Sequence, residues 1–107
     1  MITKKRKGNT LILEILEGSL TVACLYAAYT TWDRNRMIVS TLKTEKEWRG
    51  NGYASKLLRR AILEARRNRC KVIELEDCSD YYGLPNNIYI KHGFKYTDND
   101  STMEIVL

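Results

Sequence analysis

The sequence predicts a single domain of the α/β or α+β class, in which helices pack on a mixed sheet. Its 107 residues are room for one hydrophobic core. Apolar residues make up 44% of the chain and charged residues 29%, a balance typical of folded globular proteins and not of disordered ones. The spacing of apolar residues is strand-like in the first half, becomes helical in the middle, and returns to strand-like near the end.

The first half predicts three strands. Residues 10–17 are rich in Leu and Ile, Gly18-Ser19 can turn the chain, and residues 20–31 are rich in Val, Tyr and Thr. A polar turn at residues 33–36 leads to a third strand over residues 37–44. Residues 1–9 contain a run of Lys and Arg, and we expect them to form a flexible basic terminus.

A long helix is predicted from about residue 52 to residue 68. Its apolar stripe, at three- and four-residue steps, consists of Ala54, Leu57, Leu58, Ala61, Ile62 and Ala65. On the polar surface, Glu64 is spaced to pair with Arg60 or Arg67.

The last third predicts a strand, a short helix and two further strands. In the strand over residues 71–78, Ile73 and Leu75 alternate with Glu74 and Glu76, so one face is buried and the other polar. Pro85 suits the first turn of the short helix, and Gly93 the position after its end. Residues 94–97 and 102–107 close the sheet.

The charge and the cysteine and histidine content limit the classes of function that the chain can have. Eighteen Lys and Arg against 13 Asp and Glu give a net charge of +5, which favours an anionic partner such as a phosphorylated cofactor, nucleic acid or an acidic surface. Three cysteines without CxxC spacing and a single histidine, His92, argue against a disulfide framework, a metal site and a Ser-His-Asp hydrolase. With no signal peptide or membrane anchor in view, we expect a reducing, cytoplasmic environment.

An anion site is predicted where the third strand leads into the long helix. Gly50 and Gly52 let the backbone approach a ligand closely, and the first N–H groups of the helix have no partner within it. Arg49 adds a permanent positive charge. Two glycines before a helix are more often only a tight turn, and the spacing fits neither a Walker loop nor a dinucleotide fingerprint.

Two motifs make the signal specific. Trp48-Arg49-Gly50-Asn51-Gly52-Tyr53-Ala54 resembles the pyrophosphate motif Arg/Gln-x-x-Gly-x-Gly/Ala of the GNAT superfamily of N-acetyltransferases. Ile88-Tyr89-Ile90-Lys91-His92-Gly93-Phe94 is similar to the family's Leu-Tyr-x-Lys-x-Gly-Phe signature. The resemblance implies a mixed, mostly antiparallel sheet with one long and one short helix, in a minimal version without the family's N-terminal helices.

The resemblance also implies roles for individual residues, with acetyl-CoA as cosubstrate. The pyrophosphate would lie against Arg49, Gly50, Asn51, Gly52, Tyr53 and Ala54, and the pantetheine arm against Leu42, Lys43 and Thr44. The family's asparagine before the tyrosine is Tyr82 here, so Asn87 is the nearby candidate for that cofactor contact. Tyr89 matches the tyrosine that protonates the CoA thiolate, its alternative role being an aromatic packing anchor.

Two features depart from the family pattern. Ile38 occupies the position of the glutamate that serves some relatives as general base, so Glu76 and Glu74 are the substitutes, although either is equally well explained as part of a solvated strand face. Without N-terminal helices one sheet face is left open, to be covered by a second subunit, a partner or the substrate. We expect a homodimer.

The leading hypothesis is an N-acetyltransferase that moves an acetyl group from acetyl-CoA to a primary amine of a small molecule or protein, by direct attack in a ternary complex. The alternative is a non-catalytic module of the same fold that binds nucleic acid or a protein through the basic helix. The arginines that favour this alternative are Arg59, Arg60, Arg66, Arg67 and Arg69.

Overall fold

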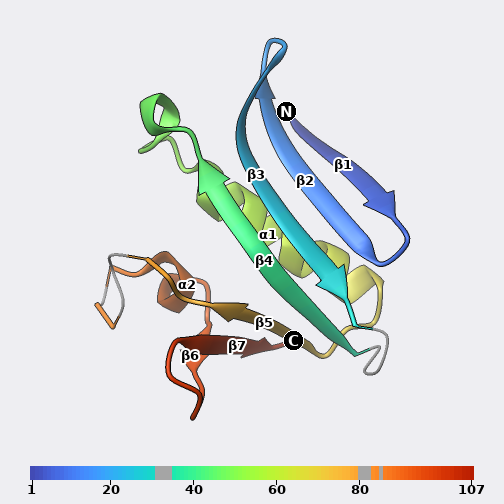
Figure 1. Ribbon diagram of the computed structural model, residues 1–107, viewed down its shortest axis with the longest axis vertical. Helices are drawn as coiled ribbons and strands as arrows, with labels where there is room; N and C mark the ends of the chain where they lie inside the picture. Colours follow the sequence, from blue (N-terminus) through green and yellow to red (C-terminus); the bar gives the residue numbers. More distant parts are fainter. Residues whose placement is uncertain (31–34, 80–82, 85) are drawn as a thin grey trace.

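The computed structural model describes residues 1–30, 35–79, 83–84 and 86–107. It contains one seven-stranded sheet with strand order β1-β2-β3-β4-β5-β7-β6 (Figure 1). The elements in chain order are β1 (Ile2–Lys7), β2 (Thr10–Glu17), β3 (Leu20–Tyr29), β4 (Arg36–Thr44), the 3₁₀ helix η1 (Lys46–Trp48), α1 (Tyr53–Arg67), β5 (Val72–Glu76), α2 (Ile88–Lys91), β6 (Lys95–Tyr96) and β7 (Thr102–Val106). Among the strands of the described residues, only β4 and β5 pair in parallel. The predicted mixed, mostly antiparallel sheet with one long and one short helix is confirmed.

The basic N-terminal segment is a strand, so the predicted flexible terminus is wrong. β1 pairs with β2 along its whole length. Lys4 forms an ion pair with Glu64 of α1 (Nζ to Oε1, 3.2 Å). Arg6 donates to the Asn68 side chain and lies over the Tyr29 ring, 4.2 Å from its centroid. These cations stay ordered because α1 and β3 supply their partners.

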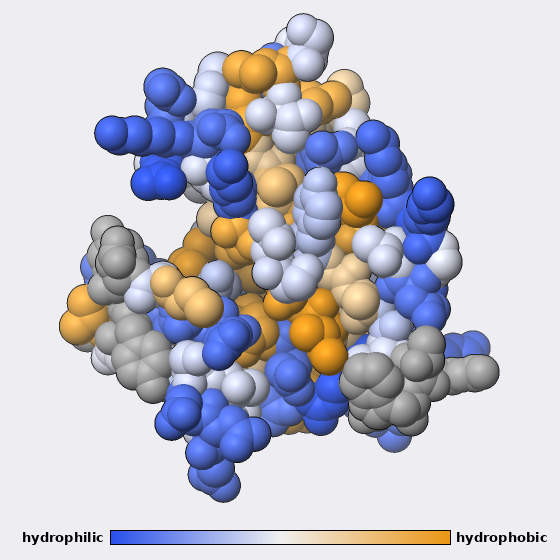
Figure 2. Space-filling view, in the orientation of Figure 1, coloured by the Kyte–Doolittle hydropathy of each residue, from blue (hydrophilic) through white to orange (hydrophobic). Residues whose placement is uncertain are grey.

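Both helices lie on one side of the sheet, behind it in Figure 1. The apolar stripe of α1 packs on strand residues that alternate toward it; these include Leu11, Leu13, Ile15, Leu25, Met37, Val39, Ile73, Leu75 and Met103. The opposite face carries half-buried Ile12, Cys24 and Ile38 and the exposed Tyr26. Figure 2 views this open face and shows apolar patches among polar side chains.

Glu64 joins α1 to the outer edge of the sheet. The residue is 2% exposed, and its carboxylate contacts Lys4, Arg60 and Arg67 at 3.2, 3.0 and 3.3 Å. Burial acts to raise the pKa of Glu64, but the hydrogen bonds and charges of Arg60 and Lys4 outweigh it and hold the pKa below its usual value. Glu64 is therefore ionised at neutral pH.

We expect Glu64→Gln to destabilise the protein at neutral pH by roughly 2 kcal/mol, because the buried carboxylate that pairs with Lys4, Arg60 and Arg67 loses its charge. A carboxyl group whose pKa is lowered by folding stabilises the protein above its unfolded-state pKa, here 4.5, and this contribution disappears as the pH falls through the lower folded-state pKa. The difference in unfolding free energy between the two proteins should therefore shrink below pH 4.5, as measured by urea denaturation at several pH values.

Glu14→Gln is the matched control. Within the described residues Glu14 pairs only with the exposed Lys5, at 3.5 Å, so this substitution should cost about 0.5 kcal/mol or less. A loss in Glu64→Gln that stays constant across this pH range would contradict the role of its charge.

Candidate active site

A groove opens where β4 and β5 separate. The two strands pair from Arg36 opposite Val72 to Val39 opposite Leu75 and no further. At that point Tyr26 pairs with Thr41 and Ala27 with Val39, so Ser40 is an extra residue that forms a β-bulge. A bulge bends its strand and increases its twist. Past it, every second residue of β4 directs its N–H and C=O away from β3 and toward the groove.

The groove collects most of the residues that the sequence predicts to bind a cofactor. It has a volume of about 610 Å³, and its lining residues are Leu42, Lys43, Thr44, Arg49, Gly50, Gly52, Ala54, Ser55, Cys78, Ser79 and Ile88. Three elements contribute: the end of β4, the start of α1, and the segments around the end of β5 and α2. Figure 2 shows the hollow on the left edge of the molecule, between η1 and α2.

The start of α1 is built to hold an anion. Gly50 and Gly52 have positive φ angles of 85° and 76°, and Gly52 is the N-cap residue of the helix. This cap makes no side-chain hydrogen bond, and the first turn contains no acidic residue. The first backbone N–H groups of the 15-residue helix are thus left for a ligand, and the helix dipole adds positive potential there.

Side chains of the loop brace it against the sheet. Arg49 Nε donates to the Thr44 carbonyl at 3.2 Å, and Asn51 Nδ2 donates to the Trp48 carbonyl at 2.9 Å. The Tyr53 hydroxyl donates to Glu17 at 2.6 Å, a hydrogen bond that raises the pKa of the phenol. Asn51 and Tyr53 do not line the groove. Their side chains shape the loop, which leaves only their backbone N–H groups for an anion.

Asn87 does not serve as a side-chain contact to the cofactor. It is fully buried, and its Oδ1 caps α2 by accepting from Tyr89 N at 2.8 Å and Ile90 N at 3.3 Å. Its Nδ2 donates to Asp77 at 2.7 Å. The prediction that Asn87 replaces the family's asparagine is therefore wrong. Tyr82 and Pro85, which also entered the sequence predictions, lie outside the described residues.

Tyr89 lies beside the groove, in an adjoining hollow that shares Leu42, Cys78 and Ser79 with it. It lines a hollow of about 340 Å³ with Ser40, Thr41, Leu42, Glu76, Cys78 and Ser79. Its ring meets Phe94 edge to face, with centroids 6.1 Å apart. Burial, followed by the charges of Asp77 and Cys78, raises the pKa of Tyr89. The phenol is therefore protonated at neutral pH, as a proton donor must be.

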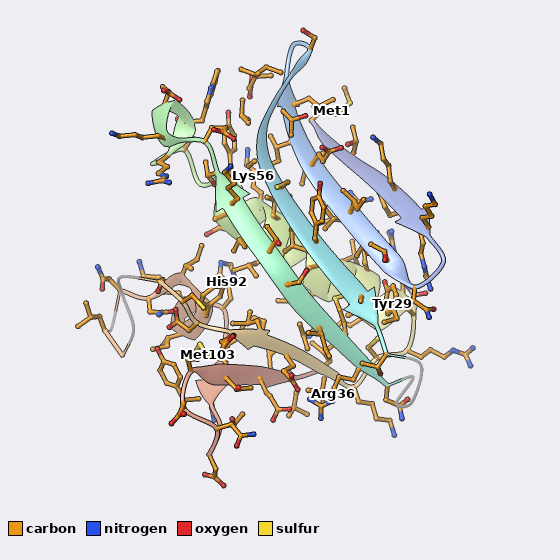
Figure 3. All side chains as sticks on the ribbon, viewed as in Figure 1. Met1, Tyr29, Arg36, Lys56, His92 and Met103 are labelled. Atoms are coloured by element: carbon orange, nitrogen blue, oxygen red, sulfur yellow. The ribbon has the colours of Figure 1, made fainter. Side chains whose placement is uncertain are left out.

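Two carboxylates, Glu74 and Glu76, lie on the open face of the sheet beside this hollow. Both line a cleft of about 420 Å³ with Ile38, Val39, Ser40, Leu75, Cys78 and Thr102. Glu74 is held by Arg36 at 2.8 Å, and Arg36 is at the far end of β4 from the groove (Figure 3). Glu76 is exposed, accepts from Ser101 Oγ at 2.9 Å, and also lines the hollow of Tyr89. Glu76 is thus the carboxylate that is better placed for chemistry.

Sequence reasoning missed Asp77, which is 3% exposed at the end of β5. In the sequence, Asp77 only marks the end of a strand of alternating residues, and no motif indicates that its side chain is buried. The described residues hold no cluster of three or more His, Cys, Asp or Glu side chains suited to a metal ion. None of the helices in the described parts of the chain combines the length and apolar character that crossing a bilayer requires.

The comparison with family models decides the identity of the fold. Residues 7–96 match the model described as "Acetyltransferase (GNAT) domain". The chain belongs to the GNAT acetyltransferase family. A search of curated proteins gives no significant match.

Solved structures of this family share the architecture. The PaiA N-acetyltransferase from Thermoplasma acidophilum, in complex with coenzyme A, superposes with a TM-score of 0.78 at 19% identity, over 92% of this chain and 62% of that one. A GNAT acetyltransferase from Elizabethkingia anophelis with acetyl-CoA bound gives 0.73 at 17% identity, over 92% and 77%. The NatC complex bound to Gag peptide and CoA gives 0.69 at 25% identity, over 92% and 70%. The chain thus spans less than two thirds of the PaiA protein.

The three cysteines differ in exposure, so their reactivity can test whether the groove is open to solvent. Cys78 is exposed and lines the groove, the hollow and the cleft. Cys24 is half-buried, and burial followed by the charge of Glu14 raises its pKa, whereas Cys70 is buried. We expect iodoacetamide at neutral pH to modify Cys78 about tenfold faster than Cys24, and Cys70 only after unfolding.

A mass-spectrometric time course of alkylation measures these rates, with Cys78→Ser as the control that should lose the fast phase. If Cys24 reacts as fast as Cys78, the exposure assigned to the groove is incorrect.

Proposed function

We propose that this protein is an N-acetyltransferase that transfers the acetyl group of acetyl-CoA to a primary amine by direct attack in a ternary complex. The observation that supports this most strongly is the continuity of the groove. Together with the adjoining hollow, it brings the helix start suited to an anion and the open edge of β4 next to the protonated phenol of Tyr89. These are the features needed to hold a pyrophosphate, an amide-bearing arm and a thiolate leaving group.

The cofactor would run along the groove in one direction. Its pyrophosphate would accept hydrogen bonds from the backbone N–H groups of residues 50–54, with the exposed Arg49 guanidinium nearby. Its pantetheine arm would lie along Leu42, Lys43 and Thr44 and pair with those of their backbone groups that point away from β3, as an added strand does at a sheet edge. The thioester would then lie beside the Ser40 bulge, close to Tyr89.

The reaction needs a base and an acid, and the two candidates come from opposite faces of the sheet. The amine nitrogen attacks the thioester carbonyl carbon, the C–N bond forms, and the C–S bond breaks as CoA thiolate leaves. Glu76 on the open face would take the amine proton, and Tyr89 on the helix side would protonate the thiolate. Backbone N–H groups of β4 would stabilise the negative charge on the carbonyl oxygen. The acceptor would enter from the open face, and a homodimer that covers this face stays a prediction.

One observation favours a second candidate function. Glu64 is the only acidic residue of α1, and it is buried. Arg59, Arg66 and Arg69 are exposed, and no ion pair to them is found within the described residues. A nucleic-acid-binding module would use this surface, and its affinity would fall steeply with salt concentration. Such a module needs no acetyl-CoA, so the next experiment separates the two functions.

Isothermal titration calorimetry should detect saturable binding of acetyl-CoA that is weakened at least about tenfold by Gly52→Ala, because a Cβ would enter the space of the pyrophosphate. Gly8→Ala is the matched control: Gly8 has a similar φ of 60° in the β1–β2 turn, at the opposite end of the sheet from η1 (Figure 1). Both variants carry the same backbone strain of about 1 kcal/mol, so only the first should lose affinity. Absence of saturable binding by the wild-type protein, or equal affinities for both variants, would refute the assignment.

Tyr89→Phe should lower kcat by about a hundredfold, because the packing ring is kept and only the proton donor is lost. Glu76→Gln should lower kcat by at least about tenfold while leaving the affinity for acetyl-CoA unchanged, because an amide cannot take up the amine proton. The measurement is steady-state turnover across pH, with an amine chosen from a panel of diamines, aminoglycosides and lysine peptides. Full turnover by Tyr89→Phe, when chemistry is rate-limiting, would leave Tyr89 only a packing role.

A further inference from the structure

Asp77 is a buried carboxylate that the proposed reaction does not use directly. It follows β5 and is 3% exposed. Its Oδ1 accepts from Ser79 N at 3.0 Å and Ser79 Oγ at 2.6 Å, and its Oδ2 accepts from Asn87 Nδ2 and Tyr96 Oη, both at 2.7 Å. Burial acts to raise the pKa of Asp77, but these hydrogen bonds outweigh it and keep the pKa low. The group is therefore a fixed negative charge with four donors.

The contacts of Asp77 lead to both walls of the groove. On one side Ser79 lines the groove and the hollow of Tyr89. On the other side Asn87, which donates to Asp77, accepts hydrogen bonds from Tyr89 N and Ile90 N and so caps α2. The helix α2 has four residues, too few to be stable by its own hydrogen bonds, so its position depends on this cap and on packing.

We propose that Asp77 is a positioning residue for acetyl transfer, which through Asn87 fixes α2 and holds the Tyr89 hydroxyl in the hollow beside the groove. The inference rests on the proposed function, in which Tyr89 is the proton donor. The charge of Asp77 contributes as well, because a nearby carboxylate disfavours the phenolate and keeps Tyr89 protonated. A purely structural Asp77 would affect stability alone.

An exchange of the two side chains separates these roles. Asp77→Asn places an amide against the amide of Asn87 and removes the charge. Asn87→Asp still caps α2 but brings two carboxylates together. The double variant Asp77→Asn/Asn87→Asp restores one amide donor facing one carboxylate and returns a negative charge near Tyr89. Glu64→Gln serves as a control that lowers stability far from the groove.

We expect kcat to fall at least about tenfold in each single variant and to return to within about threefold of wild type in the double variant. In Asp77→Asn the alkaline limb of the pH–kcat profile should move to lower pH, and Glu64→Gln should change neither quantity. Where a single variant does not fold, the double variant decides: near-normal kcat supports the proposal, and a folded double variant with low kcat overturns it.

The two proposals fail in different ways. If Tyr89→Phe lowers kcat but folded Asp77→Asn keeps the kcat and pH profile of the wild type, only the role of Asp77 is overturned. A wild-type protein that binds no acetyl-CoA and acetylates no amine overturns the proposed function, and the role of Asp77 with it.

Discussion

The separation of β4 from β5 after Val39 is the constraint on which the site depends. Two parallel neighbours require a crossover, and α1 provides it, so the helix must begin near the end of β4. The start of α1 and the free end of β4 therefore meet at one edge of the sheet. Ligands in open sheets with parallel strands bind at the carboxyl ends of those strands. The Ser40 bulge widens this opening by bending β4 away from its neighbour.

Two buried carboxylates each join two elements of the fold. Glu64 ties β1 to α1 through Lys4, and Asp77 ties α2 to the end of β5 through Asn87. Each is ionised because it gathers enough donors to outweigh its desolvation. Both carboxylates act on the helix side of the sheet. The opposite face stays open at Glu76, where an acceptor amine has room to approach.

The features that the sequence predicts correctly are those set by residues close together in the chain. The period of α1, the glycines before it and the two family motifs follow from backbone geometry and short-range spacing, and they gave the fold and most groove residues. β1 was missed because Lys4 and Arg6 are ordered by partners about 60 residues away instead of by an apolar pattern. Asn87 was assigned to the cofactor because its contact with Asp77 arises only when α2 folds back on β5. The bulge at Ser40 is set by the pairing of β3 with β4, which one strand's sequence does not encode.

The central claim is that the groove between β4 and the start of α1 holds the cofactor. It is tested most directly by titrating ¹⁵N-labelled protein with coenzyme A and following the backbone amide resonances. If the groove binds the cofactor, saturable shifts should centre on Leu42, Lys43, Thr44 and residues 50–54, with little change at the exposed Arg66 of α1 and at Arg69 just after it. Shifts confined to the exposed arginines at Arg66 and Arg69, or no saturable shifts at all, would contradict this placement of the cofactor.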